Sequence, residues 1–156
     1  MKIGIIVYSL SEHTFSVAQK LHERLSADGH VVNIERVVPE GQVKPRYVDV
    51  TFREQPDTSQ FDALIFGSPV HAFNLAPAMK VYLNQIPSLE DKKVACFVTK
   101  SVPFDWTGGN QAIKTIKTIC QSKGGIILGS GIVNWSMSRG KKIKNLIDLF
   151  STFFSD

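Results

Sequence analysis

The first sixteen residues of the chain, Met1 to Ser16, read MKIGIIVYSLSEHTFS, and the rest of the chain is organised around them. The apolar run from Ile3 to Tyr8 ends at a cluster of turn-forming polar residues, which is typical of a buried β-strand. A helical pattern of apolar residues begins directly afterwards. The stretch therefore predicts a buried strand that leads through a short polar turn into a helix.

The polar turn carries three hydroxyls and an imidazole, at Ser9, Ser11, His13 and Thr14. A turn in this position lies beside the free backbone N–H groups of a helix start, where the helix dipole is positive, so it is a candidate seat for a phosphate group. A second interpretation stays open, because Ser and Thr clusters cap many helices that bind no ligand. The turn matches neither a Walker A loop nor a GxGxxG dinucleotide fingerprint.

The rest of the chain alternates between strand-like and helix-like stretches. Further strands are expected at residues 30–37, 61–68, 93–99 and 126–133, and the partial alternation of 30–37 indicates a strand less fully covered than the first. The first helix is expected to end at Asp28-Gly29. Two later helices are expected to span residues 111–122 and 138–154. This alternation predicts an α/β fold, in which a parallel sheet of five strands has helices on both faces.

The other connections are less regular. Pro69 is expected to end the third strand, and Asn74 is expected to cap the following helix, with Pro77 in its first turn. Residues 39–60 hold three prolines and are expected to be mostly irregular, with a short strand around 47–52.

Composition restricts the class of protein. A chain of 156 residues that is 43% hydrophobic and 21% charged is expected to form one domain over 1–156. We expect no secretory signal, because the N-terminus passes directly from Lys2 into a short strand-like run, and no apolar run approaches the roughly 20 residues that span a membrane. Cys96 and Cys120 have neither CxxC nor metal-ligand spacing, so they are expected to be buried thiols in a reducing compartment, by default the cytoplasm. We expect no metal site and no contact with a membrane.

The net charge of +4 is unevenly distributed. Residues 1–98 carry 10 Lys and Arg against 11 Asp and Glu, whereas residues 99–156 carry 8 against 3. No DNA- or RNA-binding motif accompanies this surplus, so we do not expect nucleic acid as the partner. The basic part is expected to be a solvated face or the docking site of a partner with an acidic surface.

Three loops are expected to meet beyond the carboxyl ends of the strands, where open parallel sheets bind their ligands. They are residues 9–14, 69–74 and 99–109, which follow the first, third and fourth strands. The last two loops contain the aromatic residues Phe73 and Trp106 and the pair Gly108-Gly109. Together with the phosphate seat, they suit a planar aromatic ligand that has a phosphate tail.

Three motifs in these loops resemble those of the flavodoxin-like FMN-binding flavoproteins, in their short-chain form. They are Ser9-x-Ser11-x-His13-Thr14, the run Gly67-Ser-Pro-Val-His-Ala-Phe-Asn74, and Thr99 followed by Trp106-Thr-Gly108-Gly109. The resemblance covers essentially the whole chain and implies a three-layer sandwich with strand order 2-1-3-4-5. It also implies bound FMN at the switch between the first and third strands.

The resemblance implies which part of the cofactor each of these residues would contact. Ser9, Ser11, His13 and Thr14 would hold the phosphate. Two loops would border the flavin ring. The first consists of Pro69, Val70, His71, Ala72, Phe73 and Asn74, and the second of Thr99, Lys100 and Ser101. Trp106, Gly108 and Gly109 would close one edge of the ring. Glu12 departs from the pattern, because the family's phosphate loop usually has glycine there. Its carboxylate must therefore point away from the phosphate.

Three functions are open at this point. The resemblance implies a small electron carrier that works between redox partner proteins. The first alternative is an NAD(P)H-dependent flavin or quinone reductase, although no nicotinamide fingerprint is present. The second is a non-redox binding protein that keeps the fold and has lost FMN, and Glu12 is the reason to consider it. No residue pattern for hydrolytic catalysis is present, so no catalytic residue is predicted.

Overall fold

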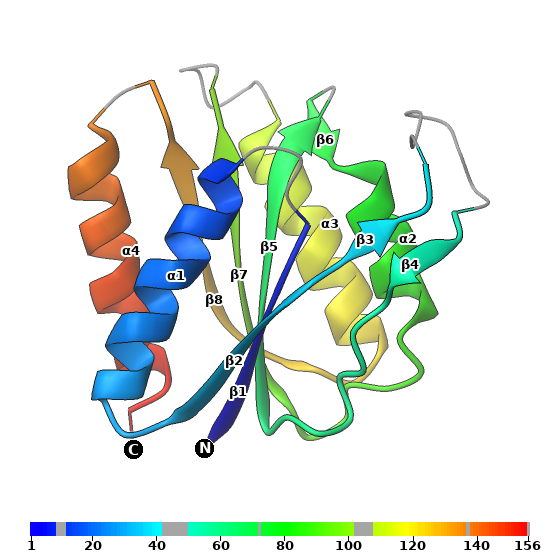
Figure 1. The fold of residues 1–156 in the computed structure, drawn as a ribbon, viewed down its shortest axis with the longest axis horizontal. Coiled ribbons are helices and arrows are strands. Elements are labelled where there is room, and N and C mark those ends of the chain that lie inside the picture. The colour runs from blue at the N-terminus through cyan, green and yellow to red at the C-terminus, as the bar shows by residue number, and fades with distance from the viewer. Residues whose placement is uncertain (9–11, 42–49, 72, 102–107, 137, 156) are drawn as a thin grey trace.

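The computed structural model describes residues 1–8, 12–41, 50–71, 73–101, 108–136 and 138–155. Its main sheet has the strand order β2-β1-β5-β7-β8, and all of these neighbours pair in parallel (Figure 1). This order confirms the predicted 2-1-3-4-5 arrangement. The strands are β1 (Lys2–Val7), β2 (Val31–Arg36), β5 (Ala63–His71), β7 (Lys93–Lys100) and β8 (Ile126–Asn134).

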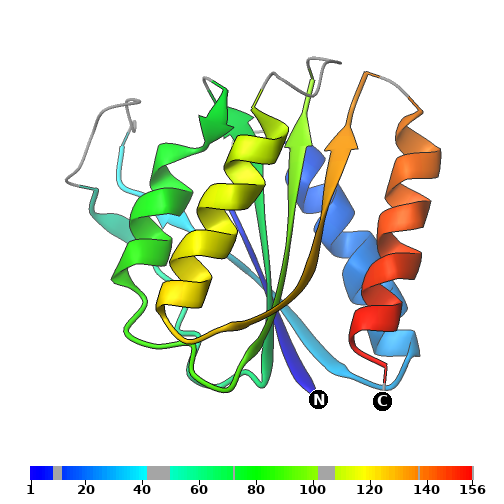
Figure 2. The same cartoon turned by 180° about the vertical axis from the view of Figure 1, so that it is seen from behind.

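Two helices cover each face of the sheet, so the fold has the predicted three layers (Figures 1 and 2). Helices α1 (Glu12–Ala27) and α4 (Arg139–Phe153) lie on one face, and α2 (Pro77–Gln85) and α3 (Gly109–Ser122) lie on the other. Each pair buries an apolar stripe against the sheet, which divides the core into two clusters. The apolar residues that α1 buries lie at helical spacing; these are Val17, Ala18, Leu21 and Leu25.

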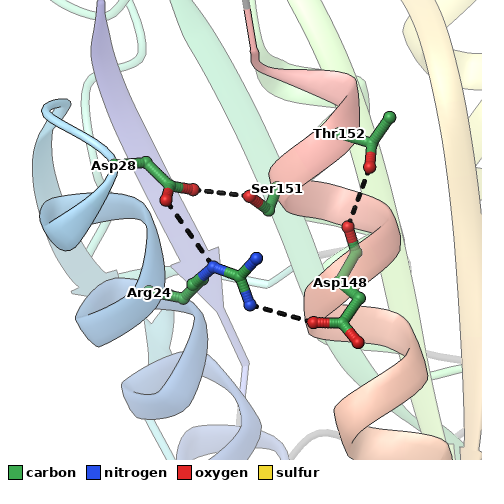
Figure 3. Close-up of polar contacts among 5 residues, drawn as sticks. All are labelled: Arg24, Asp28, Asp148, Ser151 and Thr152. Carbon is green, nitrogen blue, oxygen red and sulfur yellow. Dashed lines mark hydrogen bonds and ion pairs between the residues drawn. The ribbon is translucent and has the colours of Figure 1, made fainter.

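Helices α1 and α4 are also joined by polar contacts near their carboxyl-terminal ends (Figure 3). The Arg24 guanidinium donates to Asp148 at 2.9 Å and lies 3.6 Å from Asp28. Asp28 in turn accepts a hydrogen bond from the Ser151 hydroxyl at 2.5 Å. Because these groups are exposed to solvent, their contacts contribute little to the free energy of unfolding.

Pro69 does not end the third strand, contrary to the sequence-based expectation. Strand β5 continues to His71, and Pro69 pairs in register with Thr99 of β7. The Gly67 carbonyl faces β1, where it accepts from the Tyr8 N–H at 3.1 Å, and Pro69 faces the same side two residues later. Gly67 is the last residue of β5 that pairs in register with β1, so Pro69 stands at the very end of this ladder. The N–H that proline lacks therefore removes at most the last hydrogen bond of the ladder.

Asn74 is not the N-cap of α2, which corrects a second expectation. It belongs to β6 (Asn74–Leu75), which folds back on β5 so that His71 lies opposite Asn74. The Asn74 side-chain oxygen accepts from the Leu75 N–H at 2.7 Å and from the Thr115 hydroxyl at 3.2 Å. Its capacity for local hydrogen bonds is used in the hairpin, and α2 starts at Pro77.

The irregular segment contains a small second sheet. Strand β3 (Val38–Pro39) pairs antiparallel with β4 (Phe52–Glu54), beyond the end of β2. The expected strand at 47–52 overlaps β4 only at Phe52, and its residues 47–49 lie outside the described part of the chain. The fifth strand is also less buried than expected, because β8 is an edge strand and Ile126 at its start is 49% exposed.

Both cysteines are buried core thiols, as predicted. Burial raises the pKa of Cys96 and of Cys120 to about 12. At pH 8 only about one thiol in ten thousand is then ionised, and the thiolate is the reactive form. We expect iodoacetamide to leave the native protein unlabelled over an hour and to modify both residues within minutes in 8 M urea. Rapid labelling of the native protein, read by mass spectrometry, would contradict this burial.

No helix in the described part of the chain is both long enough and apolar enough to cross a membrane.

Candidate functional site

A cavity of about 200 Å³ lies at the carboxyl edge of the sheet, beyond the ends of β5 and β7. It is bordered by the start of α1 on one side and by the two strand ends on the other. All seven of its lining residues belong to the predicted site, and they are His13, Pro69, Val70, His71, Thr99, Lys100 and Ser101. The topology therefore brings the three predicted loops together at one place.

Helix α1 begins at Glu12, so the free N–H groups of its first turn lie at this edge. The Glu12 side chain is 77% exposed, and its carboxylate lies 3.6 Å from the Arg36 guanidinium of β2. Glu12 does not line the cavity. Its carboxylate is thus turned toward Arg36 of β2 and not into the cavity.

Thr14 and Thr99, both predicted site residues, contact each other. Their hydroxyl oxygens are 2.9 Å apart, and the two residues are 0% and 3% exposed. This buried hydrogen bond ties the first turn of α1 to the end of β7, beside the cavity that Thr99 lines. The structure thus gives the Thr14 hydroxyl a partner within the protein, and a contact between Thr14 and a phosphate stays a prediction.

The second and third predicted loops also touch each other. Phe73 has a positive φ of 64° and a side chain that is 59% exposed, at the tip of the β5–β6 hairpin. Gly108, whose φ is 106°, caps α3 directly beneath that tip. A Cβ atom built on Gly108 would lie 2.2 Å from the Phe73 carbonyl carbon. Only glycine permits this approach of the two backbones.

His71 is half-buried at the rim of the cavity, with its ring centroid 6.3 Å from that of Tyr8 in an edge-on arrangement. Burial lowers the pKa of His71 below its ordinary value of about 6.5. The imidazole is therefore neutral at pH 7 and can serve as a hydrogen-bond donor or acceptor without adding charge to the site.

A pH titration tests this assignment. Because the folded-state pKa of His71 is lowered, the unfolded chain binds the proton first as the pH falls below about 6.5. The contribution of His71 to stability is complete above that pH and is lost as the pH falls through the folded-state pKa. We expect the His71 ring proton to titrate below pH 6.5 in NMR spectra, and a midpoint at or above 6.5 would contradict the burial described.

Trp135 was not predicted, yet it contacts the site directly. Its ring stacks on His13 with a centroid distance of 4.1 Å and an interplanar angle of 12°. Its backbone N–H donates to the Lys100 carbonyl at 2.7 Å. Trp135 follows the carboxyl end of β8, at the same edge as the three predicted loops. The available signal was therefore an aromatic residue directly after the fifth strand.

The remaining predicted residues fall into two groups. Asn74 and Gly109 adjoin the cavity without lining it, and a Cβ atom on Gly109 would lie 3.5 Å from the Lys100 side chain. Four predicted residues, Ser9, Ser11, Ala72 and Trp106, lie outside the described residues.

The fold agrees with that of known proteins. Solved structures that share the fold include oxidised flavodoxin 1 from Bacillus cereus, with a TM-score of 0.70 and 15% identity over 99% of this chain and 97% of that one. Two-electron reduced flavodoxin from Megasphaera elsdenii has a TM-score of 0.69 and 19% identity, over 96% and 98% of the two chains. Fusobacterium nucleatum flavodoxin bound to flavin mononucleotide has a TM-score of 0.66 and 16% identity, over 97% and 95%.

These structures place the chain in the flavodoxin-like fold that the sequence predicted. A family model described as NADPH-dependent FMN reductase matches residues 1–139, which is most of the chain. The protein therefore belongs to the NADPH-dependent FMN reductase family of flavodoxin-like proteins.

Proposed function

We propose that the protein binds FMN at the carboxyl-edge cavity and carries electrons between redox partners. The observation that carries this proposal is the lining of the cavity, because all seven residues were expected to border FMN. Membership of a family named for FMN reduction supports the same cofactor. So does the relative from Fusobacterium nucleatum, which has flavin mononucleotide bound.

The residues present fit this cofactor at its two ends. The phosphate would lie at the start of α1, held by Ser9 and Ser11, the first-turn amides and His13. The ring would lie between the β5–β6 hairpin and residues 99–101, where the exposed Phe73 ring offers an aromatic surface. Trp106, Gly108 and Gly109 would close one edge. A cavity of about 200 Å³ would hold only part of the ligand, because pockets that enclose drug-sized ligands usually measure about 300–1,000 Å³.

FMN would supply the redox chemistry, and the protein would bind it, orient it and set its electrostatic surroundings. Lys100 lies at the end of β7, is 7% exposed and lines the cavity. Its ammonium would offset negative charge that develops on the ligand. The neutral His71 would border the ring without adding charge.

We place this activity in the cytoplasm, in one domain that spans 1–156, with a protein partner whose surface is acidic. Two buried free thiols support a reducing compartment. The net charge of +4 supports an acidic partner, because opposite charges steer association.

A second candidate is direct reduction by NADPH, which the family match favours. One experiment separates the two. The purified protein is loaded with FMN, desalted and mixed with NADPH in the absence of oxygen, while absorbance near 450 nm is followed. We expect the flavin to be retained and to stay oxidised for minutes. Bleaching within seconds would make the protein a reductase, and loss of the flavin on desalting would leave a binding protein without FMN.

A further inference from the structure

The first turns of α4 carry a concentrated positive charge. Four of its first six residues are Arg139, Lys141, Lys142 and Lys144, and all four are exposed. We call these four residues the basic surface. Among the ion pairs between described residues, none involves the basic surface. Its charge is therefore directed at solvent.

This placement works against the stability of the helix. The amino-terminal end of a helix carries a partial positive charge, which favours acidic residues there and disfavours basic ones. The first turn of α4 contains no acidic residue. The single acidic residue of the helix, Asp148, lies in its second half and accepts a hydrogen bond from Arg24 (Figure 3). An arrangement that is unfavourable for the helix itself points to an anionic partner outside it.

The basic surface lies beside the cofactor cavity. Helix α4 begins at the end of the molecule where the strands have their carboxyl ends (Figure 1). The Arg139 guanidinium lies 4.9 Å from the centroid of the Trp135 ring, and the same ring stacks on His13, which lines the cavity. A continuous row of three side chains thus leads from the basic surface to the site.

We propose that the basic surface, with Trp135 at its border, is the docking site for an acidic redox protein. This inference rests on the proposed electron transfer. Charge complementarity selects the sign of the partner, and a partly exposed tryptophan beside arginine is typical of residues that dominate binding energy at protein interfaces. A redox centre must come close to the flavin to exchange electrons, and docking at this edge achieves that. A nucleic acid has no such centre to bring near.

The test measures electron transfer from the FMN-loaded, dithionite-reduced protein by stopped flow. The acceptors are a plant plastocyanin, which is acidic, and a mitochondrial cytochrome c, which is basic. Between about 20 and 300 mM salt, we expect the rate constant with plastocyanin to fall about tenfold or more, because salt screens attraction between opposite charges. With cytochrome c we expect no such fall.

Two double variants with the same change in net charge locate the effect. Lys141→Glu with Lys142→Glu alters the basic surface. Lys20→Glu with Arg53→Glu alters exposed residues in the middle of α1 and on β4, which lies beyond the opposite edge of the sheet. We expect the first pair to lower the low-salt rate with plastocyanin at least tenfold and to remove most of its salt dependence. The second pair should lower the rate by less than about threefold.

Two further readouts separate docking from damage. The rate with benzoquinone, which is small and neutral, should be unchanged in both double variants. The melting temperature of the Lys141→Glu/Lys142→Glu variant should not fall, because acidic residues favour a helix start.

Equal losses in the two double variants, with flavin retained, would overturn the docking surface and leave the redox function standing. Binding to RNA is measured for the same variants. If Lys141→Glu with Lys142→Glu abolishes RNA binding and leaves electron transfer unchanged, the docking surface is also overturned. A protein that retains no flavin would overturn the redox function, and the docking inference with it.

Discussion

Gly108→Ala is expected to lower the free energy of unfolding by about 2–5 kcal/mol, the sum of a steric clash and an unfavourable backbone conformation. The new methyl group would lie 2.2–2.4 Å from three backbone atoms of Phe73. Backbone atoms cannot move aside as the end of a flexible side chain can, so the hairpin and α3 would have to separate. Urea unfolding followed by circular dichroism measures the change.

Gly29→Ala is the matched control for this variant. Gly29 also has a positive φ, of 100°, at the end of α1, but no atom lies within 4 Å of a Cβ built there. It therefore carries the backbone cost alone, about 1–2 kcal/mol. Equal losses from the two variants would show that the two loops do not meet at Gly108.

Thr14→Val is expected to lower the free energy of unfolding by about 1–3 kcal/mol, because it leaves the buried Thr99 hydroxyl without its partner. Replacing both residues by valine removes both polar groups from the interior, and most of the loss should be recovered. The double variant is also informative about the ligand. Binding of FMN within about threefold of the natural chain would show that the buried Thr14 hydroxyl does not hold the phosphate.

The contrary result would be equally clear. If the double variant is stable yet binds FMN at least tenfold more weakly, Thr14 holds the phosphate, as the resemblance implies. The single variant Thr99→Val completes the comparison. If the loss of unfolding free energy in the double variant equals the sum of the losses in the two single variants, the two hydroxyls do not form the hydrogen bond described.

Much of the fold could be predicted because the strands and helices have clear local signals. The apolar run Ile3–Tyr8 supplies most of β1, which lies between β2 and β5, and Asp28-Gly29 follows the end of α1. The strand order came from the family resemblance, since strand and helix periodicity alone does not specify neighbours. The joining of the three loops then followed, because parallel strands present their carboxyl ends at one edge.

What failed depended on contacts between distant parts of the chain. Pro69 breaks strands in general, and it is tolerated here because it stands past Gly67, the last residue of β5 that pairs in register with β1. Asn74 is a good helix cap by local chemistry, but the hairpin and Thr115 of α3 use its side chain instead. Trp135 reaches the site only because β8 lies next to β7 and ends at the same edge. None of these neighbours is visible in the local sequence.

The central claim is that the start of α1 and the carboxyl-edge cavity together bind FMN through its phosphate and its ring. The most direct test adds the protein to FMN and, separately, to riboflavin and follows the flavin fluorescence, because the two ligands differ only in the phosphate. Each hydrogen bond to a charged group contributes about 1.5–3 kcal/mol, so two or more should make FMN bind at least 100-fold more tightly. We predict one FMN per chain with that preference over riboflavin. Equal affinity for the two flavins, or no binding of FMN, would contradict the site.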